Sequence, residues 1–409
     1  MADEGPPPSI EPSTARGSSR VSGSSEPVSL ESESTPPAAQ STEPFAVTPT
    51  GPALSEAPAD VVPPLPTAVG GGDESLPAEA TWARGSLPDD APFALCLTHD
   101  VDRPFKGIRS LYYAVKERSP EHLRTMSCQE NPYWQFPDII ALERDLGVRS
   151  AFYMLFEQHL LAERPVREWF SPVSWVQHLG RYDPTTPEFL AVYEELLAGG
   201  WEVGLHGSFH SGTDRERLAA EKSTLERVLE ESIAGGRQHY LRLSVPESWR
   251  HHRDIGLTYD ASFGSGTETG FQYGYRPIRP FDDDFLVFPL TIMEQALPNP
   301  ARQPAAARDR CEELLFEAAA NEAVMTVLWH PRCFNEREFP GHRSLYRWLV
   351  ERAVELGAWV GTPGDLVEWF ERTGDSRSAD QVPEATISAS YPPNGHAPDG
   401  DGRSADGVE

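Results

Sequence analysis

The sequence predicts an α/β protein, a closed or nearly closed parallel (β/α) barrel flanked by disordered acidic tails. Two observations predict this class. Residues 89–373 alternate short apolar runs with longer amphipathic ones, which is the pattern of parallel β/α units. That stretch is also close to the size of a single barrel, about 250 residues, and it has no internal repeat of fixed period.

The two ends of the chain have a different composition. Residues 1–88 and 374–409 are rich in Pro, Ser, Glu, Gly and Ala, and their few apolar residues follow no period. Such segments cannot bury enough apolar surface to offset the entropy lost on ordering. We therefore expect a disordered N-terminal segment, one barrel over residues 89–373, and a disordered C-terminal tail.

The first expected elements of the barrel are a strand, a helix and a strand. Residues 93–98 form an unbroken apolar run of the kind found in buried strands. Residues 138–146 have a helical pattern that Gly147 ends, as glycine commonly does at a helix C-terminus. Residues 150–155 are again continuously apolar and predict the next strand.

The middle of the barrel continues the alternation. Residues 187–198 predict a helix, with proline in its first turn and two glycines after its last residue, and residues 201–205 a strand. Residues 213–233 predict a charged helix, because their apolar side chains lie near helical spacing. A further strand is expected over residues 239–243, after Gly235-Gly236.

The last part of the barrel follows the same logic. Residues 246–255 predict a helix that ends at a glycine, residues 285–290 an extended segment, and residues 307–321 a helix. Residues 324–329 predict a late strand that leads directly to His330. The remaining expected elements are a helix, a short strand and a helix, over residues 342–356, 358–361 and 363–372.

Charge excludes some classes of partner. The formal net charge is −28 and the pI is about 4.8, which argues against nucleic acid or an anionic membrane surface. No stretch resembles a signal peptide or reaches membrane-spanning length, so we expect a soluble, cytoplasmic protein without a membrane span. Arginine far outnumbers lysine. A salt-adapted (halophilic) organism and a GC-rich genome explain that composition equally well.

Two pairs of side chains predict a metal site. Asp100 and Asp102 lie two apart on an extended segment and therefore share one face, whereas His99 points to the opposite side and is expected to be buried against a helix. His206 and His210 can converge if the turn after their strand opens into a helix. Histidine and carboxylate ligands at the exits of barrel strands are typical of a hydrolytic, zinc-type site.

The order of these motifs resembles a known family. Asp-x-Asp, His-x-x-x-His, a strand-borne Arg242 and Leu-x-His330 together look like the polysaccharide deacetylases of the NodB-homology type, carbohydrate esterase family four, over about Phe93–Phe370. The resemblance implies a distorted (β/α) barrel of the glycoside hydrolase/deacetylase type. The first motif, Thr-His-Asp-Val-Asp, is similar to a branch that separates its two aspartates by one residue.

The resemblance also implies residue roles. The implied metal ligands are Asp102, His206 and His210, and the implied catalytic residues are Asp100 as general base, His330 as general acid, Arg242 orienting the base and Asp260 supporting Arg242. The metal would be a divalent ion, with zinc favoured and cobalt, manganese or nickel also accepted by such ligands. The segment Arg242–Pro246 departs from the usual Arg-x-Pro motif, and Gly207 stands where most relatives have Ser or Thr.

These roles predict a metal-dependent hydrolase that removes N-acetyl groups from an amino sugar, a polysaccharide or a glycan precursor. Its partner would be an N-acetylated carbohydrate. Two alternatives remain open. One keeps the chemistry but acts on a non-sugar linear or cyclic amide. The other is a catalytically inactive barrel that binds a glycan.

Overall fold

The computed structural model describes residues 76–77, 80–83, 85–106, 131–171, 174–175, 178 and 181–373. Most of the predicted N-terminal tail and the whole C-terminal tail lie outside this range. The tail boundary predicted at residue 88 needs a correction. Strand β1 (Thr81–Trp82) pairs with β7 (Ile278–Arg279), and Leu76 is buried in the core. Ordered structure therefore begins before residue 89.

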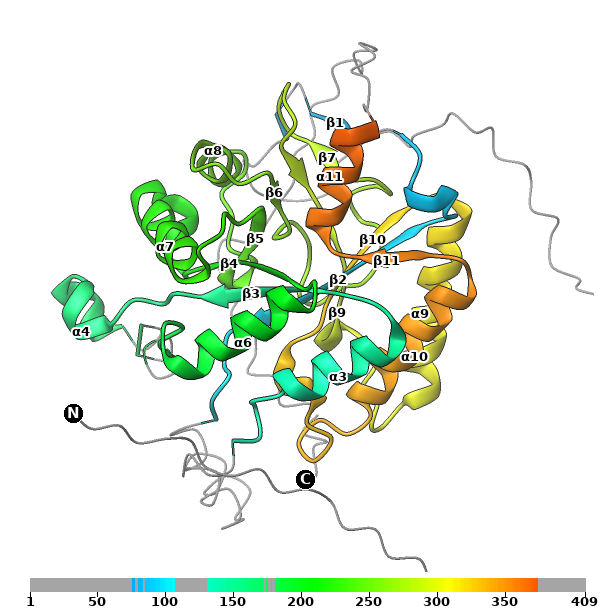
Figure 1. Cartoon of the computed structure of the whole chain (residues 1–409), viewed down its shortest axis with the longest axis horizontal. Helices are drawn as coiled ribbons and strands as arrows, with labels where there is room; N and C mark the ends of the chain where they lie inside the picture. The colour runs from blue at the N-terminus through cyan, green and yellow to red at the C-terminus, as the bar shows by residue number, and fades with distance from the viewer. Residues whose placement is uncertain are drawn as a thin grey trace, which may run out of the picture. The chain divides into compact units, whose positions relative to one another are not determined.

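The strands of the described residues form one eleven-stranded sheet (Figure 1). Parallel pairing runs in the order β6-β5-β4-β3-β2-β10-β9. Besides β1 and β7, the strands are β2 (Ala94–Val101), β3 (Ala151–Leu155), β4 (Glu202–Gly207), β5 (Gly235–Gln238), β6 (Tyr259–Asp260), β8 (Leu286–Val287), β9 (Leu290–Met293), β10 (Val324–Leu328) and β11 (Trp359–Gly361).

One segment joins the two ends of this parallel run. Strand β8 pairs with β6, and β9 pairs with β10, yet only Phe288 and Pro289 separate β8 from β9. Between them, the amide of Phe288 donates to the carbonyl of Asp260 at 2.8 Å, and the amide of Leu290 donates to that of Phe263 at 2.7 Å. The sheet therefore curls round into a distorted (β/α) barrel, which confirms the predicted fold class.

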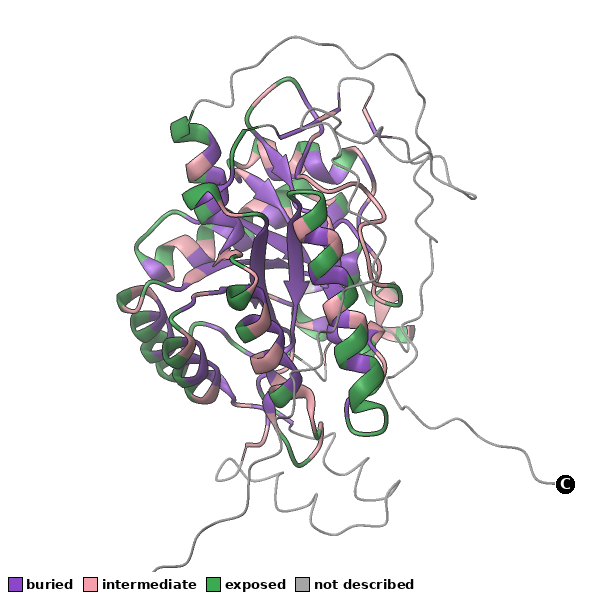
Figure 2. Cartoon of the chain, turned by 90° about the vertical axis from the view of Figure 1, so that its right-hand side faces the viewer, coloured by how far each residue is buried: buried purple, intermediate pink, exposed green. Residues whose placement is uncertain are grey.

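Helices surround this sheet, with their exposed faces outward and the strands buried inside (Figure 2). Local sequence explains several of their ends. Gly147 takes a left-handed φ of 71° after α3, proline occupies the first turn of α6, and the Asp214 side chain accepts from the Arg217 amide at the start of α7. Among the described residues the α-helices are α3 (Phe136–Leu146), α4 (Leu160–Glu163), α6 (Pro187–Ala198), α7 (Arg215–Leu229), α8 (Glu247–Asp254), α9 (Pro304–Ala320), α10 (His342–Glu355) and α11 (Pro363–Thr373).

Strand β2 divides its side chains between two environments. Leu95 and Leu97 belong to the large apolar cluster that includes residues of the surrounding helices, whereas Ala94 and Cys96 belong to a second cluster that includes Tyr153. His99 follows the first set: it is buried and contacts Glu143 of α3 at 2.9 Å. The expected burial of His99 against a helix is confirmed, and the alternation leaves Asp100 on the opposite face.

The predicted strand over residues 239–243 is wrong in position. Strand β5 covers Gly235–Gln238, and residues His239–Leu241 form a 3-10 turn instead. Two glycines at the start of a strand are unusual, but the neighbouring strands of the sheet leave no space for larger residues here. A Cβ on Gly236 would lie 1.9 Å from the backbone oxygen of Leu205, which leaves no space for a side chain. The shift moves Arg237 into the strand and His239 to its exit.

Candidate metal centre and active site

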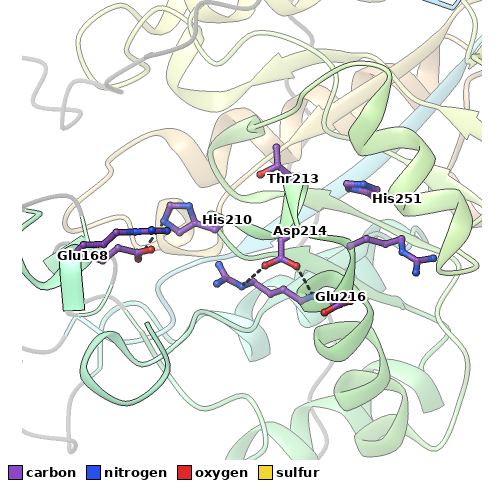
Figure 3. Close-up of a pocket in the computed structure, with 9 residues that line it drawn as sticks. Glu168, His210, Thr213, Asp214, Glu216 and His251 are labelled. Atoms are coloured by element: carbon purple, nitrogen blue, oxygen red, sulfur yellow. Dashed lines mark hydrogen bonds and ion pairs between the residues drawn. The ribbon is translucent and has the colours of Figure 1, made fainter. Parts of the chain in front are cut away.

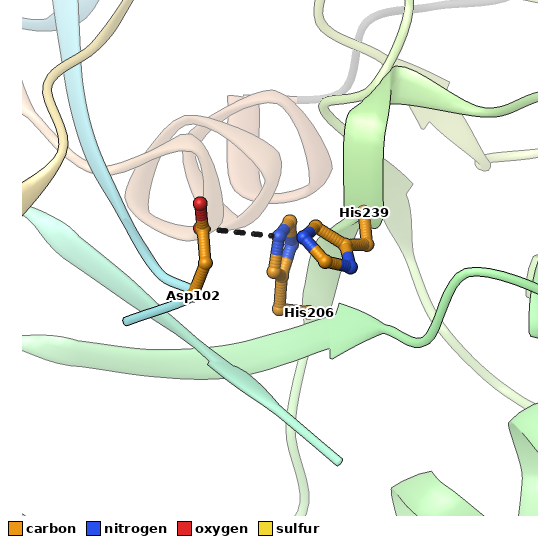
Figure 4. Close-up of side chains that lie close together, drawn as sticks. All are labelled: Asp102, His206 and His239. Carbon is orange, nitrogen blue, oxygen red and sulfur yellow. Dashed lines mark ion pairs between the residues drawn. The ribbon is translucent and has the colours of Figure 1, made fainter. Parts of the chain in front are cut away.

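Three side chains from three strand exits meet at one place (Figure 4). Asp102 follows β2, His206 lies near the end of β4, and His239 follows β5. Each offers a ligand atom, and these atoms all lie within 4.8 Å of one another. Asp102 Oδ1 is 3.6 Å from His206 Nε2, and the two imidazole ring centres are 5.1 Å apart. All three residues are largely buried.

The protonation pattern of this group suits a cation. His206 Nδ1 lies 2.9 Å from the carbonyl oxygen of Arg237, which can only accept, so Nδ1 carries the proton and Nε2 presents a lone pair. That Nε2 faces Asp102 Oδ1, and both atoms are buried without a hydrogen-bond partner among the described residues. Burial lowers the pKa of His206 and favours the neutral, metal-binding form. A divalent metal would satisfy these atoms.

Glu157 provides the nearest support for His239. Its Oε2 lies 3.5 Å from His239 Nδ1 and accepts from the amide of Phe209 at 3.1 Å, while its Oε1 accepts from Arg164. Burial opposes ionisation, but hydrogen bonding and charge from His239 and the charge of Arg164 lower the pKa of Glu157 to about 2. A buried carboxylate beside the remaining nitrogen of a histidine is a common arrangement at metal sites.

A second group of possible ligands, Asp100, Asp102 and His330, shares Asp102 with the first. In this group the Asp102 carboxylate already faces two basic side chains. Arg332 donates to Asp102 Oδ2 at 3.3 Å, and His330 Nε2 lies 3.5 Å from the same oxygen. A cation is therefore better placed on the His206 side of Asp102, where no positive side chain faces the carboxylate at such a distance among the described residues.

His330 is arranged to hold a proton. Its Nδ1 lies 2.7 Å from Glu294 Oε1, so the carboxylate accepts from the ring. Burial disfavours the imidazolium, but Glu294 and then Asp102 outweigh that effect and raise the pKa of His330. Burial likewise opposes ionisation of Glu294, yet His330 lowers its pKa to about 2. The ring can thus carry a second proton on Nε2, on the side of Asp102.

Asp100 is held by an arginine other than the predicted Arg242. Arg237 of β5 donates from Nη1 to Asp100 Oδ1 at 2.8 Å and to Thr98 Oγ1 at 2.9 Å, and from Nε to the carbonyl of Ala261 at 2.7 Å. Burial alone would lower the pKa of this guanidinium, but Asp100 raises it. Asp100 Oδ2 remains near His206 Nε2, at 3.9 Å.

The structure does not bring His210 to Asp102 and His206. The chain after β4 forms a turn and the 3-10 helix η3 (Ser211–Thr213) rather than an α-helix, so residues four apart do not stack on one face. His210 instead lies 3.8 Å from Glu168 in a separate pocket of about 520 Å³ (Figure 3). In the structure His239, rather than His210, lies beside Asp102 and His206.

Arg242 and Asp260 also differ from their expected positions. Arg242 is exposed, and its Nη1 donates to the carbonyl of Phe209 at 3.3 Å rather than to Asp100. Asp260 accepts from Trp249 Nε1 at 3.2 Å and lies 3.2 Å from His252 Nδ1. Its negative charge raises the pKa of Arg237 after the larger effects of burial and Asp100, so it supports Arg237 and not Arg242.

Two residues of the candidate site that the sequence-based prediction lacks, Arg237 and His239, follow from the displaced strand. Arg237 and His239 alternate with Gln238 directly after a double glycine, and strand glycines can mark a close approach of backbones. The double glycine is therefore a sequence signal for the position of this strand. No sequence signal marks Glu157 and Glu294. Each contacts its histidine across 82 and 36 positions of the chain, respectively.

No protein-family model matches the chain, and no curated protein matches it. Solved structures resemble it at low identity. A protein from Mycobacterium smegmatis assigned as a polysaccharide deacetylase is 15% identical with a TM-score of 0.48, over 74% of this chain and 98% of its own. One from Pseudomonas aeruginosa, also assigned as a polysaccharide deacetylase, is 12% identical with a TM-score of 0.41, over 71% and 95%. A CE4-family pseudoenzyme from Bacillus anthracis is 13% identical with a TM-score of 0.34, over 67% and 65%.

Within the part of the chain that the structure describes, every helix is too short or too polar to cross a membrane.

Proposed function

We propose that the protein is a metal-dependent hydrolase that removes N-acetyl groups from an N-acetylated amino sugar or a glycan that contains one. A single observation carries this proposal: Asp102, His206 and His239 face one another with unpartnered, buried ligand atoms, directly beside Asp100 and His330. An acid, a base and a metal-binding group within one buried cluster are what hydrolysis of an unactivated amide requires.

In this proposal Asp102, His206 and His239 hold a divalent ion, with zinc favoured. Such an ion supplies Lewis acidity, which polarises an amide carbonyl and makes water a stronger nucleophile. Two nitrogens and one carboxylate leave coordination positions open for water and substrate. Glu157 orients His239 through its second nitrogen, as the Arg237 carbonyl does for His206.

Two proton transfers fall to residues of the chain. Asp100 takes a proton from the attacking water, and Arg237 orients that carboxylate through the 2.8 Å hydrogen bond. His330 gives the proton on Nε2 to the departing amine nitrogen. Glu294 holds the ring by its Nδ1–H and stabilises the imidazolium before transfer.

The test combines metal analysis with Asp100→Asn. We expect the wild type to bind one divalent ion and to release acetate from N-acetylglucosamine compounds. Asp100→Asn should bind the same ion but lose activity by about 100-fold or more, since general-base catalysis contributes about 10²–10⁴-fold. Glu355→Gln, at an exposed helix end, is the control and should leave both properties unchanged.

Three other outcomes would each reject part of the proposal. Turnover of a linear or cyclic amide without acetate release from any sugar would refute the sugar substrate but keep the metal chemistry. A protein that binds metal and glycan and hydrolyses nothing would be an inactive binding barrel. A protein that binds no divalent ion would refute the hydrolase altogether.

A further inference from the structure

Two arginines beside the candidate metal centre have no acidic partner within the described part of the chain. Arg103 directly follows Asp102, and its Nη2 donates to the hydroxyl of Tyr240 at 3.4 Å. Arg242 donates to the carbonyl of Phe209 and lies 4.4 Å from the centre of its ring. Neither forms an ion pair with a carboxylate of the described residues, although many arginines in the same part of the chain do.

Aromatic rings connect these arginines to the metal centre. The ring of Tyr240 lies 4.2 Å from that of His239 and 5.7 Å from that of Phe209. The Phe209 amide donates to Glu157, the carboxylate that also faces His239. Arg103, Tyr240, Phe209 and Arg242 therefore form a continuous edge of the site, which we call the arginine rim. Tyr240 is 39% exposed, so part of the rim is open to solvent.

The backbone of the rim is strained. Tyr240 has a φ of 60° and Leu241 a φ of 53°, both in the left-handed region that residues with a Cβ rarely adopt. Backbone strain of this kind is concentrated at functional sites. Here it belongs to the turn that brings His239 to the metal centre and Tyr240 between the two arginines.

Charged residues of both signs lie next to the rim, in a chain that carries a net charge of −28. The pocket beside His210 is lined by further basic residues, Arg167, Arg215 and Arg217, as well as by three acidic ones (Figure 3). Glu168 and Asp214 already face Arg164 and Arg217, so these two carboxylates do not neutralise the arginines of the rim.

We propose that the arginine rim binds an anionic group, a phosphate or a carboxylate, carried by the same substrate whose N-acetyl group lies at the metal centre. The substrate class is then an anionic N-acetylated amino sugar rather than a neutral one. This inference rests on the proposed hydrolase function. Guanidinium groups bind phosphate and carboxylate oxygens through paired N–H donors, and Tyr240 offers a flat face against a sugar ring.

The first experiment measures binding of inorganic phosphate to the metal-loaded protein by calorimetry. We expect the double variant Arg103→Gln/Arg242→Gln to bind at least tenfold more weakly than the wild type. The double lysine variant, which keeps charge but loses the planar fork, should fall between them. Arg253→Gln, an arginine already paired with Asp283, is the control and should match the wild type. Equal phosphate affinity in the wild type and both double variants would overturn the proposal, because phosphate would then bind to the metal alone.

The second experiment compares kcat/KM for N-acetylglucosamine, its 6-phosphate and N-acetylmuramic acid. We expect an anionic sugar to be preferred at least tenfold, and the preference to disappear in the glutamine double variant. The better of the two anionic sugars identifies phosphate or carboxylate. Hydrolysis with no arginine-dependent preference would refute anion binding by the arginine rim but would leave the proposed hydrolase function intact. Arginine-dependent phosphate binding without hydrolysis of any N-acetylated sugar would refute the hydrolase, and with it the assignment of a sugar substrate.

Discussion

Two buried glutamates next to one loop show how surroundings decide the charge of a residue. Glu157 accepts from the amide of Phe209, and Glu221 accepts from the amide and hydroxyl of the preceding Ser208. Burial opposes ionisation of both. At Glu157 the effects of His239 and Arg164 outweigh burial, and the pKa falls to about 2. At Glu221 no cation opposes burial, and the pKa rises to about 8. One carboxylate is an anion beside a candidate metal ligand, and the other is a neutral hydrogen-bonding group.

This difference predicts how stability changes with pH. The pKa of Glu221 is raised from an ordinary value of 4.5, so the unfolded chain loses this proton first as pH rises. Stability from this group is therefore complete below about pH 4.5 and falls between about pH 5 and 8, at up to roughly 1.4 kcal/mol per pH unit. Glu221→Gln should remove that slope and be more stable than the wild type at pH 8. Urea unfolding from pH 5 to 8 measures it.

The matched control is Glu355→Gln, whose carboxylate is exposed and should leave the slope unchanged. An identical slope in Glu221→Gln and the wild type would show that Glu221 is ionised in the folded protein.

At the scale of elements, the contact between β4 and β5 positions most of the site. His206 lies on β4, Arg237 on β5, and the two strands pair in parallel at this pair of residues. The close approach depends on Gly236, where a Cβ would collide with the backbone of Leu205. Because a backbone atom cannot rotate away as a side chain can, the strands must separate to admit even a methyl group.

Gly236→Ala should therefore destabilise the protein by about 1–3 kcal/mol, the usual cost of overpacking, or by more. It should also weaken metal binding, because it displaces His206 relative to His239. Thermal unfolding and metal titration measure the two effects. Gly266→Ala is the control, since a Cβ there would lie 3.3 Å or more from its neighbours. A Gly236→Ala protein with unchanged stability would contradict the close contact.

The same strand shows the limit of the sequence-based prediction. Continuous apolar runs placed β2, β3, β4 and β10 correctly, because burial on both faces leaves a strong pattern. Strand β5, Gly-Gly-Arg-Gln, has no such pattern, since its glycines fit neighbouring backbones and its arginine pairs with Asp100. The expected strand was displaced by four residues. The predicted strand therefore carries Arg242 instead of Arg237 and lacks His239 as a candidate ligand.

At the scale of the whole molecule, the candidate ligands connect distant parts of the chain. Asp102, His206 and His239 are brought together only when β2, β4 and β5 have assembled, so the unfolded chain holds no comparable site. A ligand that binds only the folded state stabilises it by mass action, by about 2.7 kcal/mol at a concentration 100 times its Kd. Metal binding should therefore raise the temperature of global unfolding.

The prediction separates the two histidines that compete for the third ligand position. Zinc at 100 times Kd should raise the Tm of the wild type by several degrees, at roughly 2 °C per kcal/mol for a chain of this size, and a chelator should reverse the rise. His239→Ala should lose most of this stabilisation. His210→Ala should keep it, because His210 faces Glu168 outside the metal group. The opposite result, a rise in His239→Ala and none in His210→Ala, would restore the His-x-x-x-His pair and require the loop after β4 to bring His210 to Asp102.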